Sequence, residues 1–214
     1  DWTKPKQFNL MFKTFLGPVE SQENTVYLRP ETAQGMFVDF KNVLDTSRKT
    51  VPFGIAQIGK AFRNEITPGN FIFRTREFEQ MEIEYFIQAP KRDKDWQEHF
   101  EYWRKEMRDW MEKDLGLDKK NIHEFEVPED KRAHYSKRTI DFEYDFPFGQ
   151  NELYGLAYRT DFDLRNHYKE APYRDPQTGE EFWPHVIEPT WGVDRSVLAA
   201  LVEAYREEEG RVVL

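Results

Sequence analysis

The chain has 214 residues, of which 38% are hydrophobic and 16% aromatic, enough apolar material for a buried core in one or two domains. It contains no cysteine, which excludes disulfide scaffolds, zinc–thiolate sites, iron–sulfur clusters and thiol nucleophiles. Forty acidic residues against 31 basic ones give a net charge of −9, which argues against a surface coated with nucleic acid.

The start of the chain, Asp1-Trp2-Thr3-Lys4, has neither an initiator methionine nor the apolar region of a signal peptide. No apolar run approaches the roughly 20 residues of a membrane-spanning helix. We therefore expect a cytoplasmic protein without membrane contact, and we expect this chain to be one part of it.

The first regular elements expected are a short strand over residues 25–29 and a helix that follows it. Pro30 in the first turn and Glu31 beside it are ordinary signals for the start of a helix. The apolar positions of this helix recur at helical spacing, at Met36, Phe37, Phe40, Val43 and Leu44.

Residues 53–88 predict two strands joined by a turn around Pro68-Gly69. Alternate side chains of a strand share a face, so Arg63 and Glu65 would project together. In the second strand one face is apolar and is expected to be the core side, with Met81, Ile83, Tyr85 and Ile87. The other face is expected to be a polar platform, with Phe78, Gln80, Glu82 and Glu84. The acids of this strand have few cations near them, which implies a cationic ligand group, whereas the plainer interpretation is a solvated hairpin face.

Residues 91–120 predict an amphipathic helix, because aromatic and methionine side chains recur there at three- and four-residue spacings. Strands are expected again over 138–164, where polar and apolar residues alternate from Thr139 to Phe146. A last strand at 186–189 is followed by a helix that begins near Gly192. Strands interrupted by helices, without a regular alternation of the two, favour an α+β fold with an antiparallel sheet.

Two motifs in these elements resemble a known family. Residues 62–82 read Phe62-Arg63-Asn64-Glu65, a Pro-Gly loop, and then a run from Arg74 to Glu82, which resembles the second signature motif of class II aminoacyl-tRNA synthetases. Gly192-Val193-Asp194-Arg195 and the helix that extends to 206 resemble the third motif. The segments 8–12, 29–35 and 184–189 narrow the resemblance to the dimeric type of glycyl-tRNA synthetase.

The resemblance implies a class II catalytic core over residues 1–89 and 136–214, with a helical insertion over 90–135. Its sheet would be antiparallel and flanked by helices, in agreement with the α+β reading of the pattern. The first class II motif would precede residue 1, and an anticodon-binding domain would follow residue 214. A homodimer would form through segments N-terminal to this chain.

The activity implied is the ATP-dependent activation of glycine to glycyl-adenylate, followed by transfer of the glycyl group to the 3′ end of tRNA(Gly). The catalytic residues would be Arg63, on the α-phosphate, and Arg195, over the γ-phosphate. Glu65 would accept from the adenine amino group and Phe78 would stack on the adenine. The plainer alternatives are a salt bridge between Arg63 and Glu65, a core role for Phe78 and a surface role for Arg195.

The resemblance also implies three sets of binding residues. The ATP site would comprise Arg63, Asn64, Glu65, Phe73, Arg74, Thr75, Arg76, Glu77, Phe78, Glu152, Leu153, Gly192, Val193, Asp194 and Arg195. The glycine site would comprise Glu31, Phe78, Glu79, Gln80, Met81, Glu82, Glu188, Pro189, Thr190, Trp191 and Gly192. Glu152 would help to hold Mg²⁺, which prefers hard oxygen ligands, and the competing carboxylates are Asp141, Glu143 and Asp145.

Thr190 and Trp191 stand where the family has a serine and a phenylalanine, and we expect both to wall the glycine site. A basic cluster is expected to hold the phosphates of the tRNA acceptor arm and comprises Lys131, Arg132, Lys137 and Arg138. Two other functions stay open at this point: a synthetase-like accessory subunit without catalytic activity, and a class II synthetase for another small amino acid.

Overall fold

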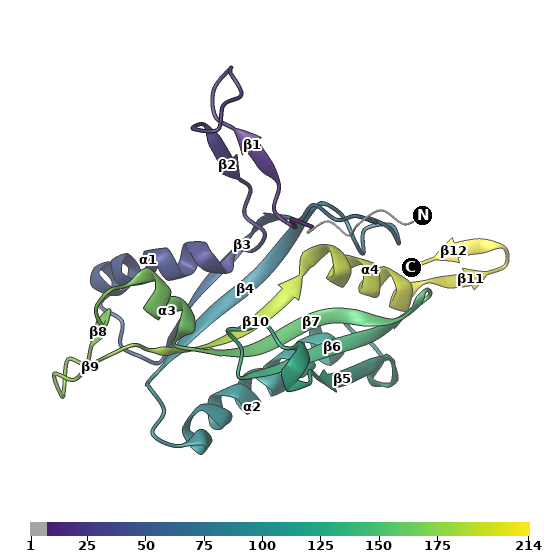
Figure 1. Ribbon diagram of the computed structural model, residues 1–214. Coiled ribbons are helices and arrows are strands. Elements are labelled where there is room, and N and C mark those ends of the chain that lie inside the picture. The colour runs from purple at the N-terminus through teal and green to yellow at the C-terminus, as the bar shows by residue number, and fades with distance from the viewer. Residues whose placement is uncertain (1–7) are drawn as a thin grey trace.

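The computed structural model describes residues 8–214, and a six-stranded sheet forms the centre of the molecule (Figure 1). All neighbouring strands in this sheet are antiparallel, which confirms the predicted α+β class with an antiparallel sheet. In spatial order the strands are β3 (Phe53–Phe62), β4 (Glu77–Ile87), β10 (His185–Gly192), β7 (Gly149–Thr160), β6 (Arg138–Phe146) and β5 (Ile122–Glu126).

Four α-helices accompany the sheet, and none of the helices described over residues 8–214 is both long enough and apolar enough to span a membrane. They are α1 (Ala33–Ser47), α2 (Asp93–Asp109), α3 (Phe162–His167) and α4 (Val193–Ala204). Figure 1 shows two hairpins that project from the body, β1 (Lys13–Phe15) with β2 (Thr25–Tyr27) and β11 (Arg206–Glu208) with β12 (Arg211–Val213). A small pair, β8 (Tyr173–Arg174) with β9 (Glu181–Phe182), lies beyond α3.

The sheet has an apolar cluster on each face. On one face, α2 and α4 pack against inward-facing residues of β6 and β7, including Phe142 and Leu156. On the other face, α1 and α3 cover one end of the sheet around Phe86 and Val186. Because α1 and α3 cover only this end, the remainder of that face is available for a pocket.

The polar and apolar side chains of β4 lie on opposite faces of the strand, as predicted, but the burial of the two faces differs from the prediction. Gln80, Glu82 and Glu84 are 7%, 4% and 0% exposed, whereas the apolar residues of the opposite face from Met81 to Tyr85 are half-buried beside α2. The prediction that the apolar face alone is the core side is therefore wrong. Residues from α3 and the loop before α1, together with the long side chain of Arg159 from β7, cover the polar face.

The predicted helix over 91–120 is shorter than its apolar pattern suggested. It ends as α2 at Asp109, continues as a π-helical turn (Trp110–Asp114), and stops before Gly116, which has a positive φ of 69°. Short 3₁₀ turns follow at Lys119–Asn121 and Glu129–Lys131, and between them β5 extends the main sheet. The segment 90–135 thus contains an edge strand as well as a helix, and its boundaries as an insertion stay a prediction.

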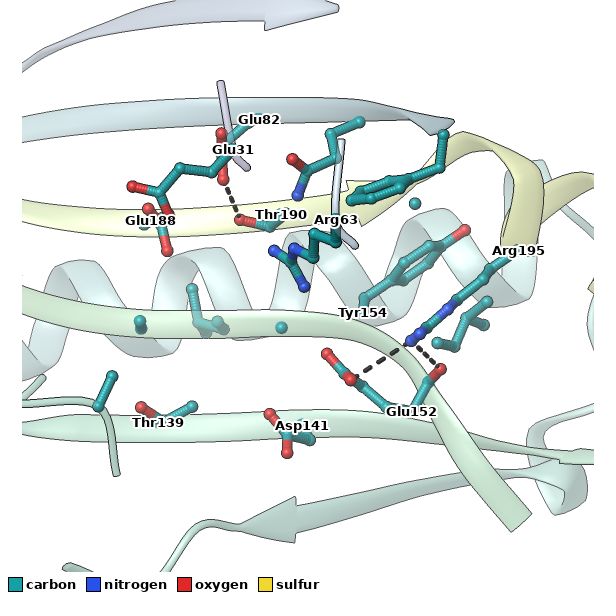
Figure 2. Close-up of a pocket in the computed structure, with 18 of the residues that line it drawn as sticks. Glu31, Arg63, Glu82, Thr139, Asp141, Glu152, Tyr154, Glu188, Thr190 and Arg195 are labelled. Carbon is teal, nitrogen blue, oxygen red and sulfur yellow. Dashed lines mark hydrogen bonds and ion pairs between the residues drawn. The ribbon is translucent and has the colours of Figure 1, made fainter. Parts of the chain in front are cut away.

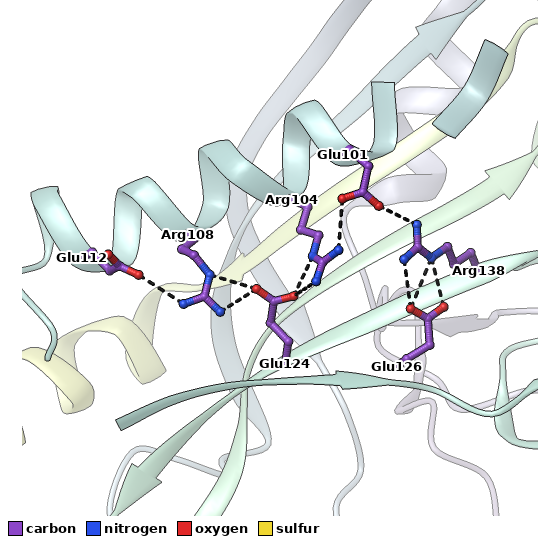
Figure 3. A network of polar contacts seen from close by, with 7 residues as sticks. All are labelled: Glu101, Arg104, Arg108, Glu112, Glu124, Glu126 and Arg138. Carbon is purple, nitrogen blue, oxygen red and sulfur yellow. Dashed lines mark hydrogen bonds and ion pairs between the residues drawn. The ribbon is translucent and has the colours of Figure 1, made fainter. Parts of the chain in front are cut away.

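A network of ion pairs fastens α2 to the edge of the sheet (Figure 3). Glu124 of β5 accepts from Arg104 at 2.6 Å and from Arg108 at 2.9 Å, and its side chain is only 16% exposed. Arg138 of β6 bridges Glu126 to Glu101 of α2. β5 carries charged residues and lacks a clear alternation of apolar ones, so its sequence does not indicate a strand. These charged residues are the groups that attach β5 to α2.

We expect Glu124→Gln to destabilise the protein by about 1–3 kcal/mol, because two partly buried arginines would lose their carboxylate partner. The free energy of unfolding from urea titration measures this change. The matched control is Glu98→Gln, which removes an exposed partner of Lys94 and should cost no more than about 0.5 kcal/mol. Equal losses in the two variants would show that the network does not hold α2 to the sheet.

Candidate active site

A cavity of about 390 Å³ lies on the polar face of the sheet, within the usual range for small-molecule sites. Strands β4, β10, β7 and β6 form its floor, and the β3–β4 loop and the segment 127–135 form its walls. Figure 2 shows Glu31, Glu82 and Glu188 together at one end, Arg63 in the middle, and Arg195 with Glu152 at the other end.

The structure brings most of the predicted site residues to this cavity from five separate segments of the chain. Those that line it are Glu31, Arg63, Glu65, Phe73, Arg74, Thr75, Phe78, Glu79, Gln80, Glu82, Glu152, Leu153, Glu188, Thr190, Gly192, Asp194 and Arg195. The predicted site residues outside the lining are Asn64, Arg76, Glu77, Met81, Pro189, Trp191 and Val193.

Strand alternation explains why several residues are outside. Met81 and Trp191 follow Gln80 and Thr190, so their side chains point to the opposite face of the sheet. Trp191 is 9% exposed there and packs edge-on against Tyr154. The expectation that Trp191 walls the glycine site is therefore wrong, and only Thr190 of that pair reaches the cavity.

Arg63 presents a guanidinium to the middle of the cavity. Its Nε donates to the carbonyl oxygen of Pro30 at 3.0 Å, and its Cζ lies 5.3 Å from the centre of the Phe78 ring. Neither Nη atom has a hydrogen-bond or ion-pair partner among residues 8–214, and Glu65 pairs with Arg74 at 3.4 Å instead. The alternative of a salt bridge between Arg63 and Glu65 is thus not realised, and the fork of Arg63 is available to an anion.

Arg195 is anchored at the far end of the cavity. Its Nε donates to the carbonyl oxygen of Phe73 at 3.2 Å, and its Nη1 donates to the carbonyl oxygen of Glu152 at 2.7 Å. The guanidinium lies 4.2 Å from the centre of the Phe73 ring, where its charge interacts with the aromatic face. Burial lowers the pKa of Arg195, but a guanidinium stays charged at any physiological pH.

Three predicted acids meet at the opposite end. Glu82 accepts hydrogen bonds from the hydroxyl groups of Thr32 and Thr190, the latter at 3.1 Å. Burial raises the pKa of Glu82 above its usual range, and these two hydroxyl donors oppose that rise. Glu31 and Glu188 line the same end, so carboxylates from a loop and two strands face one small volume.

The cation behind these acids is Arg159, which was not among the residues predicted for the site. Arg159 is 1% exposed and donates two hydrogen bonds to the carboxylate of Asp163, at 2.8 and 2.9 Å. Its Nη1 pairs with Glu188, and the ring of Tyr135 lies 3.9 Å from its Cζ. A lone arginine after the apolar run of β7, with an aspartate four residues later, was the available signal.

Two carboxylates lie together at the far end of the cavity on neighbouring strands. Burial, followed by the negative charges of Glu152 and Glu143, raises the pKa of Asp141 to about 7. Of the competing metal ligands, only Asp141 joins Glu152 in the lining. Asp145 instead pairs with His123 at 2.9 Å on the exposed edge of the sheet.

The basic cluster near residue 135 is divided by the fold. Lys131 and Arg132 line the cavity, although Arg132 also donates to the carbonyl oxygen of Val127 at 2.8 Å. Lys137 pairs with Asp93 at 2.7 Å, and Arg138 belongs to the network of Figure 3. The expectation of four residues acting together on tRNA phosphates is therefore not supported by their positions.

Comparison with known proteins decides the family. The model of the tRNA synthetase class II core domain (G, H, P, S and T) matches residues 14–205. The chain belongs to this family. It is 54% identical over 228 residues to a glycine–tRNA ligase of Thermus thermophilus, covering 98% of this chain and 44% of that protein. It is 55% identical over 223 residues to the ligase of the same name from Alkaliphilus oremlandii, covering 100% and 47%. The class II resemblance is confirmed, and the chain spans less than half the length of the curated relatives it matches.

Arg159→Met should destabilise the protein by about 3–5 kcal/mol, because two buried carboxylates would lose their cation. Urea titration measures the loss. The matched control is Arg174→Met, an exposed arginine of β8, which should change stability by less than about 0.5 kcal/mol. If the two variants are equally stable, Arg159 does not offset the negative charge of the buried carboxylates.

Proposed function

We propose that this chain carries the active site of a glycine–tRNA ligase. The observation that supports it best is the polarity of the cavity. The Arg63 guanidinium at its centre has no partner for its Nη atoms among residues 8–214, and carboxylates converge at one end. Such a site fits a small zwitterion beside a polyphosphate. The names of the 54–55% identical relatives agree with this assignment.

In the first step, a carboxylate oxygen of glycine attacks the α-phosphorus of ATP. A new phosphorus–oxygen bond forms, the bond to the β-phosphate bridge breaks, and pyrophosphate leaves with the electron pair. The attacking group is already an anion, so no protein base is needed, and the task is to position two anions and neutralise the charge between them. Arg63 is the residue we assign to the α-phosphate, where its planar fork can contact the phosphate and the carboxylate together.

The nucleotide would lie along the β3–β4 loop and the start of α4. We assign Phe78 to stacking on the adenine, Glu65 to its amino group and Arg195 to the γ-phosphate. The aromatic ring and both charged groups line the same cavity, which supports this assignment. The accessory-subunit alternative is disfavoured because a non-catalytic domain has no need of two arginines facing one cavity.

Magnesium is the metal that the proposed reaction calls for, and the donors present suit it. Glu152 and Asp141 offer carboxylate oxygens on adjacent strands, and hard oxygen ligands are those Mg²⁺ prefers. When bound, the ion would supply neutralising charge for the phosphates. Arg195, held to Glu152 at 3.3 Å, would keep that carboxylate oriented.

At the acid end, Glu31, Glu82 and Glu188 would surround the ammonium of glycine. The alternative of another small amino acid requires room for a side chain, and Thr190 restricts that room on the β10 side. Its hydroxyl donates to Glu82 at 3.1 Å, which fixes the rotation of the Thr190 side chain at this wall.

In the second step, a hydroxyl of the terminal ribose of tRNA(Gly) attacks the carbonyl carbon of the adenylate. The new ester forms as the bond to AMP breaks, AMP leaves with the electron pair, and the proton of the hydroxyl is released to solvent. We place this activity in the cytoplasm, and we propose that the active protein is a homodimer formed through segments N-terminal to this chain.

Arg63→Ala should lower the rate of glycine-dependent ATP–pyrophosphate exchange by roughly 10²–10³, the scale for loss of one transition-state donor. The measurement is made on the intact protein, with tryptophan fluorescence to show that the fold survives. The control is Arg174→Ala, which changes an exposed arginine of β8 outside the cavity and should retain most of the exchange. A folded Arg63→Ala protein with near-normal exchange would contradict the role given to Arg63.

Thr190→Gly should admit alanine measurably, because forcing one methyl group into a packed site costs about 1–3 kcal/mol and this change opens the wall. Thr190→Ser keeps the hydroxyl bonded to Glu82 and should remain selective for glycine. The rates of exchange with glycine, alanine and serine decide between these outcomes. If both variants refuse alanine equally, another residue sets the size of the site.

A further inference from the structure

Glu84 is a buried acid that the proposed reaction does not use. It is 0% exposed on the polar face of β4, and neither of its carboxyl oxygens has a hydrogen-bond donor among residues 8–214. Its polar neighbours are themselves acids, since carboxyl oxygens of Glu82, Glu84 and Glu188 all lie within 4.8 Å of one another. Two carboxyl groups at such a distance repel each other unless one of them carries a proton.

The charged groups around Glu84 come from three strands, Glu82 from β4 itself, Glu188 from β10 and Arg159 from β7. Arg159 in turn contacts Glu31 before α1 and Asp163 on α3. Among residues 8–214, Arg159 is the cation beside these carboxyl groups, and its hydrogen bonds go to Asp163 and Glu188. An ionised Glu84 would be a buried charge without a donor, which is among the costliest arrangements in a protein interior.

The donors present show which group holds the proton. Burial raises the pKa of Glu82 and raises that of Glu188 to about 8. Glu82 nevertheless receives two hydroxyl donors and Glu188 receives the guanidinium of Arg159, so each of these anions has donors that Glu84 lacks. We propose that Glu84 is a positioning residue that stays protonated and donates its hydrogen to Glu188. This bond would hold Glu188 between Arg159 and the amino group of the amino acid. The claim that Glu84 positions Glu188 for the amino acid rests on the proposed function, whereas the claim that Glu84 is protonated does not.

The direction of the pH effect follows from this arrangement. Burial, and then the negative charge of Glu188, raises the pKa of Glu84 well above its usual range. The folded protein therefore holds a proton that the unfolded chain releases at lower pH, and raising the pH weakens the fold from the unfolded pKa up to the folded one. Glu84→Gln, which cannot ionise, should be less sensitive to pH over that interval.

The first test is infrared spectroscopy of the intact protein near neutral pH. A protonated buried carboxyl group gives a carbonyl band separate from those of carboxylates. Because burial also raises the pKa of Asp141 to about 7, Asp141 adds a band of its own, so the measure is the component that wild type has and Glu84→Gln lacks. Glu98→Gln, an exposed acid on α2, should leave the band unchanged. A wild-type spectrum without the band, or a difference spectrum of wild type minus Glu84→Gln without it, would overturn the proposal.

The second test is glycine-dependent ATP–pyrophosphate exchange. Glu84→Gln keeps a neutral donor and should leave the KM for glycine within about threefold of wild type, whereas Glu84→Leu should raise it roughly tenfold or more, with the KM for ATP unaltered in both. An equal rise in both variants would overturn the positioning role. If Glu84→Leu does not fold, the infrared band and Glu84→Gln still decide. A band that depends on Glu84, in a protein that exchanges no amino acid, would support the protonation and overturn the proposed function instead.

Discussion

The burial of Arg159 among carboxylates is the constraint on which the rest of the site depends. The guanidinium comes from β7 and reaches α3 and β10, so one side chain joins the helical cover to the floor of the cavity. A buried cation of this kind has to be fully paired, and Asp163 and Glu188 provide the pairing. The acids that remain, Glu31 and Glu82, then face the cavity with charge to offer a ligand.

This constraint gives the cavity two chemically different ends. At the Arg159 end, the protein's own cation is committed to internal partners, and the space in front of it is acidic. In the middle and at the other end, Arg63 and Arg195 present positive charge beside the rings of Phe78 and Phe73. A ligand that carries an ammonium at one end and phosphates at the other matches this polarity, because electrostatic complementarity across a low-dielectric site favours one orientation.

The antiparallel strands and most of the residues that line the cavity could be predicted from the sequence, because both depend on local periodicity. Alternation along β4 separated Gln80 and Glu82 from Met81, and a glycine before a helix marked the turn at Arg195. Partners distant in the chain could not be read in this way. Arg159 meets Glu188 across two strands, and β5 is held by ion pairs rather than by an apolar pattern. The burial of Glu84 likewise depends on cover from α3 and the loop before α1.

The most direct test of the account is ATP–pyrophosphate exchange by the intact protein with each of the twenty amino acids in turn. A cavity with converging acids, walled on the β10 side by Thr190, predicts strong exchange with glycine and far weaker exchange with alanine and serine. The larger amino acids should give none. Exchange that prefers any larger amino acid, or no exchange with glycine by a folded protein, would contradict the account.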